Sequence, residues 1–113
     1  MTGILNRRRH PRFAVGIDCK LIRAATSRYD IARTGDVSAG GAMLEVRTSR
    51  AFHAGEPIDI AVNWAGRPML TSEELITARV LRADPLLGHT QRVAICFDRV
   101  QDQADALAAA AAA

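Results

Sequence analysis

Cysteine is scarce in this 113-residue chain, which contains only Cys19 and Cys96. Two cysteines are too few for the disulfide framework of a small secreted domain or for a zinc site with four cysteine ligands. Both lie in apolar runs, where a free cysteine usually acts as a small buried hydrophobic residue. We therefore expect both thiols to be buried, and we expect no metal site.

Aromatic residues make up only 4% of the chain, so valine, isoleucine, leucine and alanine must fill the core. No uninterrupted apolar stretch approaches the roughly 18 residues that a membrane-spanning helix needs. The arginines near the N-terminus are not followed by the apolar segment of a signal peptide. These absences favour a protein of the reducing cytoplasm that does not bind a membrane.

Patterns that would indicate catalysis are missing as well. Ser38 is not in a Gly-x-Ser-x-Gly nucleophile elbow, because Asp36 occupies the position of the first glycine. The three histidines are scattered and lie at neither metal-ligand nor triad spacing: His10, His53 and His89. The sequence therefore indicates a protein that is not an enzyme and that carries no cofactor.

Positive charge is concentrated in the first third of the chain, whose overall net charge is +3. Residues 1–35 carry eight Lys or Arg against two Asp, a net charge of +6, whereas residues 36–113 carry seven Arg against ten Asp or Glu, a net charge of −3. This asymmetry predicts an anionic partner for the N-terminal part. A nucleotide, a nucleic acid and a membrane surface would all satisfy it.

Short segments of alternating apolar and polar residues, separated by turn residues, predict an all-β domain. The clearest strand covers 13–21, and a turn-rich connection is expected over 35–41. Six such segments indicate a barrel or a sandwich over residues 13–100. Residues 1–12 are expected to form a flexible basic arm, and the alanine-rich residues 101–113 a helix. The other expected strands cover about 29–34, 42–46, 58–64, 76–80 and 93–97.

Two polar clusters carry the functional signal. Residues 7–12 read Arg-Arg-Arg-His-Pro-Arg, and guanidinium groups bind phosphate oxygens and guanine edges in a bidentate manner. Residues 36–41 read Asp-Val-Ser-Ala-Gly-Gly, which sets a carboxylate near a hydroxyl and beside glycines that allow close approach of a ligand. Taken separately, a solvated basic tail and an ordinary turn with glycines at positive φ remain alternatives.

In this order and spacing the two clusters resemble the signature of the PilZ domain family, Arg-x-x-x-Arg followed by Asp/Asn-x-Ser-x-x-Gly. The resemblance implies a six-stranded antiparallel β-barrel with a C-terminal α-helix. It also implies a non-catalytic receptor for the bacterial second messenger cyclic di-GMP, which changes conformation or partner contacts when it binds. Motility or exopolysaccharide control, through a separate effector protein, is common in the family.

The resemblance assigns roles to the arginines. Arg8 and Arg12 match the family arginines that hold the phosphates and guanine Hoogsteen edges of cyclic di-GMP. Arg7 matches an additional basic residue that accompanies binding of an intercalated ligand dimer in some members. Arg9, between the two motif arginines, is expected to face solvent.

The second motif supplies the other expected contacts. Asp36 matches the residue that reads a guanine Watson–Crick edge, and Ser38 the residue that bonds near the phosphate. Gly41 matches the glycine that keeps the floor of the site open. Some members carry a tryptophan near the position of Leu81, so the resemblance implies no late-strand aromatic contact with the ligand here.

Two other functions stay open at this point. One is a PilZ-like interaction domain that binds no ligand, although both motifs are intact here. The other is a nucleic-acid-binding barrel, which the composition disfavours because single-strand binding requires stacking aromatic residues. The chain has five aromatic residues, and only Phe13 lies near the arginines.

Overall fold

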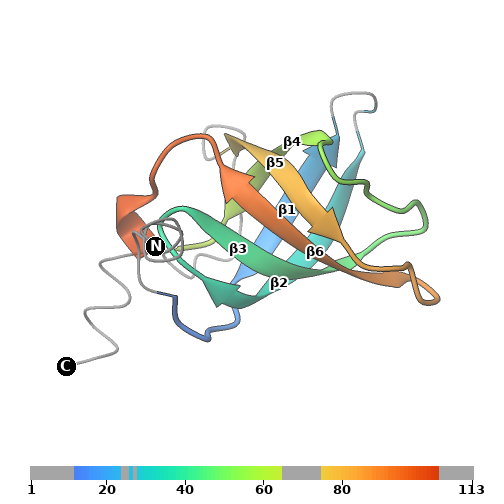
Figure 1. The fold of residues 1–113 in the computed structure, drawn as a ribbon, viewed down its shortest axis with the longest axis horizontal. Coiled ribbons are helices and arrows are strands. Elements are labelled where there is room, and N and C mark those ends of the chain that lie inside the picture. Colours follow the sequence, from blue (N-terminus) through green and yellow to red (C-terminus); the bar gives the residue numbers. More distant parts are fainter. Residues whose placement is uncertain (1–11, 24–25, 27, 65–74, 105–113) are drawn as a thin grey trace, which may run out of the picture.

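The computed structural model describes residues 12–23, 26, 28–64 and 75–104, and within them six antiparallel strands form a closed barrel. The strand order around the barrel is β1-β2-β3-β6-β5-β4 (Figure 1). The predicted six-stranded antiparallel barrel is therefore confirmed. The strands are β1 (Asp18–Arg23), β2 (Tyr29–Val37), β3 (Gly41–Arg47), β4 (Pro57–Val62), β5 (Leu75–Ala83) and β6 (Thr90–Phe97).

The core is built from the alternate residues of each strand that point into the barrel, as period-2 patterning requires. Cys19 is buried among them, as predicted, but Cys96 is exposed and that prediction was wrong. On β6 the neighbours Ile95 and Phe97 face inward, so Cys96 between them must face out. The most buried aliphatic side chains are Leu21, Val37, Leu44, Val46, Ile58, Ile60, Val80, Val93 and Ile95.

Several predicted boundaries differ from the structure. The strand predicted over 58–64 ends at Val62, and the one predicted over 93–97 already begins at Thr90. The strand predicted over 13–21 begins only at Asp18, and residues 13–17 run alongside β2 instead. The connection predicted over 35–41 is shorter, because β2 continues to Val37 and β3 already begins at Gly41. Within the described residues the C-terminal helix is a single turn over 102–104. Residues 1–11 and 105–113 lie outside the described residues, so the flexible arm and the longer helix stay predictions.

Two β-bulges interrupt the ladders. In β2 the register against β3 shifts between Thr34 and Asp36, which leaves Gly35 as the extra residue. In β5 the register against β6 shifts between Val80 and Arg82, which leaves Leu81 as the extra residue. A bulge inserts one residue on one strand and thereby changes which side chains face outward beyond it. Each bulge therefore changes which side chains of its strand face outward.

Candidate functional site

The N-terminal segment is bound to the end of β2 by a two-hydrogen-bond bridge. The amide of Phe13 donates to the Val37 carbonyl at 3.1 Å, and the Val37 amide donates to the Phe13 carbonyl at 3.0 Å. Because the bridge is antiparallel, Arg12 lies across from Ser38. The last arginine of the first motif is thus held beside the second motif.

A second attachment lies on the other side of the β2 bulge and uses the side chain of Thr34. Its hydroxyl accepts a hydrogen bond from the Ile17 amide at 2.8 Å and donates one to the Val15 carbonyl. The Thr34 amide also donates to the Ile17 carbonyl at 3.0 Å. Residues 13–17 are therefore fixed to β2 at both of their ends, which sets the position of Arg12.

Asp36 owes its orientation to the bulge at Gly35. Ala32 and Thr34 face inward, and strict alternation would turn Asp36 inward as well. The extra residue shifts the phase, so that Val37 enters the core and Asp36 is only half-buried. No described residue forms an ion pair or a hydrogen bond with the Asp36 carboxylate. Its acceptor oxygens are available to a ligand's N–H donors.

Ser38 organises the loop between β2 and β3. Its hydroxyl accepts hydrogen bonds from the amides of Gly40 at 3.2 Å and Gly41 at 3.3 Å. The Ser38 amide donates to the Gly41 carbonyl at 2.8 Å. The side chain is buried, so its first role is to close the loop that joins Asp36 to β3. Contact between Ser38 and a phosphate stays a prediction.

Gly41 is required by the neighbouring strand. A Cβ atom at this position would lie 2.3 Å from the carbonyl oxygen of Ile95 on β6. Among the described glycines only Gly55 and Gly88 have positive φ, so the alternative of positive-φ glycines at 40 and 41 is wrong. The glycine allows β3 to approach β6 closely beside the loop, which sequence reasoning could not anticipate.

The structure therefore brings four of the six predicted site residues to one end of the barrel: Arg12, Asp36, Ser38 and Gly41. Arg7 and Arg8 lie outside the described residues.

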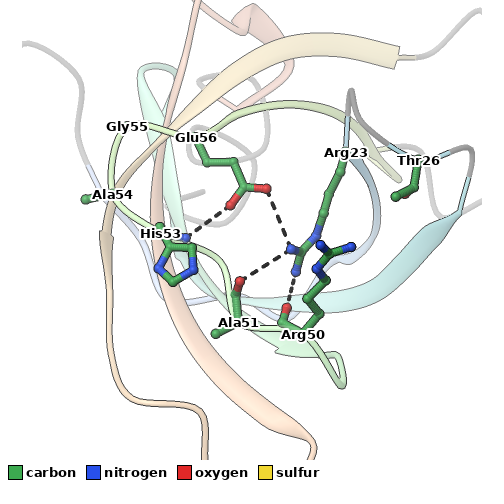
Figure 2. Close-up of a pocket in the computed structure, with 8 residues that line it drawn as sticks. All are labelled: Arg23, Thr26, Arg50, Ala51, His53, Ala54, Gly55 and Glu56. Atoms are coloured by element: carbon green, nitrogen blue, oxygen red, sulfur yellow. Dashed lines mark hydrogen bonds and ion pairs between the residues drawn. The ribbon is translucent and has the colours of Figure 1, made fainter.

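A pocket of about 580 Å³ opens at the opposite end of the barrel, where β1 finishes (Figure 2). Its centre is the buried guanidinium of Arg23, which donates to the backbone carbonyls of Arg50 and Ala51. The same group lies 3.7 Å from the centroid of the Phe52 ring and 3.7 Å from a Glu56 carboxylate oxygen. Arg23 thus fixes the β3–β4 loop. Sequence reasoning missed this residue because all its loop partners are distant in the chain.

Burial and, as the smaller cause, the nearby negative charge of Asp18 raise the pKa of the Cys19 thiol to about 12. A buried thiol of this kind is inert at neutral pH. Among the described residues, no group of three or more His, Cys, Asp or Glu side chains could hold a metal ion. No helix in the described part of the chain is long and apolar enough to cross a membrane.

The PilZ domain family model matches residues 6–112 of the chain. The chain belongs to the PilZ domain family. PilZ domains are generally non-catalytic receptor domains. No curated protein matches the sequence.

Two solved structures share the fold of this PilZ domain. One is the Bacillus subtilis inhibitor of motility (MotI/DgrA), at 18% identity and a TM-score of 0.64, with 86% of this chain and 46% of that chain covered. The chain thus spans less than half the length of that protein. The other is the PilZ domain of YcgR from Escherichia coli with cyclic di-GMP, at 20% identity and a TM-score of 0.60, with 81% and 78% covered. At these identities the likeness concerns the fold.

Proposed function

We propose that this PilZ domain is a receptor for cyclic di-GMP. The observation that carries the proposal is the bridge between Phe13 and Val37, which holds Arg12 beside the loop of the second motif. A guanidinium, an available carboxylate and a glycine-rich loop are thereby close together. The structure of the YcgR PilZ domain with cyclic di-GMP supports this ligand class.

The ligand's chemistry matches these groups. Its phosphates are anionic and suit bidentate guanidinium groups, for which each charge-assisted hydrogen bond contributes about 1.5–3 kcal/mol. The N1–H and exocyclic amine of guanine are two adjacent donors that a carboxylate can accept. In this proposal Arg8 and Arg12 hold the phosphates and Hoogsteen edges, Arg7 supports a second ligand molecule, and Asp36 reads one base.

The first test is titration calorimetry with cyclic di-GMP. We expect a dissociation constant in the micromolar range or below, which corresponds to about −8 kcal/mol or stronger. Arg8→Ala and Arg12→Ala should each lose about 1.5–3 kcal/mol of binding free energy. Arg9→Ala is the matched control and should lose little, because a solvated arginine contributes little. Equal losses at all three positions would indicate diffuse electrostatic attraction and would contradict a specific site.

The second test concerns the base. Adenine has a lone pair at N1 and no amine at C2, so cyclic di-AMP would set an acceptor against the Asp36 carboxylate. A mispaired base edge costs about 1–3 kcal/mol, so we expect wild type to prefer cyclic di-GMP by about tenfold or more. Asp36→Ala should erase most of that preference and keep the phosphate attraction. A variant that retained full guanine selectivity in a competition titration would show that the base is read elsewhere.

The same proposal implies a cytoplasmic protein that passes the signal to a separate effector protein through its own surface or conformation. Motility is a candidate output, because one structural relative is an inhibitor of motility. If wild type gives no heat at tens of micromolar cyclic di-GMP and no NMR shifts, the receptor proposal fails. A ligand-independent interaction domain would then be the better explanation.

A further inference from the structure

The two β-bulges of the barrel flank the same pair of residues. The β2 bulge faces the Leu44–Met43 step of β3, and the β5 bulge faces the Ile95–Ala94 step of β6. Met43 and Ala94 are direct partners in the β3–β6 ladder. The centre of this sheet region is thus one residue pair with an irregular strand on each side. In Figure 1, β3 and β6 lie side by side at the front of the barrel.

Each bulge places a polar side chain on the outer face beside this pair. Asp36 follows the extra residue of β2 and is the ladder partner of Met43. Arg82 follows the extra residue of β5, is exposed, and is the ladder partner of Ala94. Asp36, Met43, Ala94 and Arg82 therefore lie in one row across four adjacent strands. Three strand spacings of about 4.8 Å separate the ends of the row by roughly 14 Å.

The surface between the two ends is uncharged and made of small or flexible residues. Besides Met43 and Ala94 it contains the next ladder pair, Gly41 and Cys96. We call these four residues the outer strip. All four are half-buried or exposed, and none carries a side chain larger than methionine. A flat ring can therefore lie on the strip, with a carboxylate at one edge and a guanidinium at the other.

The Arg82 guanidinium has no partner among the described residues, whereas three other arginines of the barrel are engaged. Arg33 is paired with Asp18 at 2.9 Å, and Arg79 donates to the Gly55 carbonyl at 3.5 Å. Arg23 is buried in the opposite end of the barrel. Among the described arginines without a partner, Arg82 is the one that the β5 bulge places in the same row as Asp36.

Guanine carries the complementary pattern on its two edges. Its N1–H and exocyclic amine are donors, and O6 and N7 on the Hoogsteen edge are acceptors that bind a guanidinium in a bidentate manner. We infer that Arg82 is a further ligand-binding residue, which reads the Hoogsteen edge of the guanine that Asp36 reads from the other side, while the base lies on the outer strip. Arg8 and Arg12 then hold the phosphates and the Hoogsteen edge of the other guanine. This inference rests on the proposed function and adds β5 and β6 to a site that the two motifs place on β2 and the N-terminal segment.

The first experiment is titration of the full chain with cyclic di-GMP. We expect Arg82→Ala to weaken binding about tenfold. Arg47→Ala is the matched control, because Arg47 is another exposed arginine on the outer face of β3, four residues beyond Met43, and its loss should leave binding unchanged. If Arg82→Ala binds like wild type while Asp36→Ala is weakened, the inference is wrong and the receptor proposal stands. If wild type does not bind, both are wrong.

The second experiment tests the strip without altering the motifs. Cys96 is the exposed thiol on the strip, and Cys19, the other cysteine of the chain, is buried. Saturating cyclic di-GMP should slow alkylation of Cys96 at least fivefold, as followed by mass spectrometry. A cysteine introduced by Arg47→Cys should react at the same rate with and without ligand. Equal Cys96 rates at saturation would overturn the inference, because the base would then lie elsewhere.

Discussion

Gly41→Ala tests whether the glycine of the second motif serves the barrel or the ligand. The new methyl group would lie 2.3 Å from the Ile95 carbonyl oxygen, and Cβ atoms essentially never come within 3.0 Å of another heavy atom. Because the obstacle is backbone, β3 and β6 would have to separate by roughly 1 Å to restore normal contact. The substitution therefore acts on the strand pairing itself.

The loss in unfolding free energy can be estimated from the contacts that the added methyl group disturbs. Separation would stretch the hydrogen bond from the Phe97 amide to the Gly40 carbonyl, 2.9 Å, which joins β6 to the loop before β3. Overpacking costs about 1–3 kcal/mol, and the weakened hydrogen bond adds about 0.5–1.5 kcal/mol. We expect the free energy of unfolding to fall by about 3 kcal/mol. At an m-value of about 2 kcal/mol/M, the urea midpoint would fall by about 1.5 M.

Gly35→Ala is the matched control, because Gly35 is also a β2–β3 glycine beside the site. A Cβ there would meet only the Met43 carbonyl oxygen, at 3.8 Å, which is an ordinary contact, and the φ of Gly35 is not positive. Its urea midpoint should stay within about 0.3 M of wild type. If Gly41→Ala also unfolds at the wild-type midpoint yet loses ligand binding, the glycine serves the ligand and the reasoning from the Ile95 contact is refuted.

Two further predictions concern stability. Arg23→Ala should lower the free energy of unfolding by about 2–4 kcal/mol in urea titrations, because it leaves buried loop carbonyls without a donor and removes the contact with Phe52. A loss of ligand affinity in the folded variant would contradict the separation of the two barrel ends. The raised pKa of Cys19 makes the folded state hold a proton that the unfolded chain releases, so wild-type stability should decline between about pH 9 and pH 12. Cys19→Ala should remove part of that decline, by at most a few kcal/mol, and identical pH profiles for the two proteins would show that the thiol is not buried as described.

The strands could be predicted because each buries alternate residues, and that periodicity is local in the sequence. The bulges are visible only in the burial pattern of the structure, because an exposed Ile31 and a buried Thr34 hide the β2 bulge in the sequence. Buried positions on β2 advance from Ala32 to Thr34 in a step of two and then to Val37 in a step of three. On β5 the step from Val80 to the half-buried Ala83 is likewise three. A step of three between inward residues is what one extra residue leaves in a strand pattern.

The register between strands could not be predicted, because it depends on which distant residues meet. The pairing of Met43 with Ala94 and the approach of Gly41 to Ile95 join segments about fifty positions apart. The same holds for the buried partners of Arg23 in the β3–β4 loop. The two motifs were visible in the sequence, but their proximity follows from the bridge at Phe13, and the position of Arg82 opposite Asp36 follows from barrel closure.

The place of β6 in the barrel has a consequence for how the protein is made. Of the six strands of the barrel, β6 is synthesised last, yet it is inserted between β3 and β5, which are synthesised earlier. Until it arrives, those two strands expose unpaired edges that can associate with other chains. When β6 pairs with β3 and β5, it covers both edges and places Ala94 and Cys96 in the outer strip. A nascent chain released before residue 97 would therefore keep both edges unpaired and would be prone to aggregation.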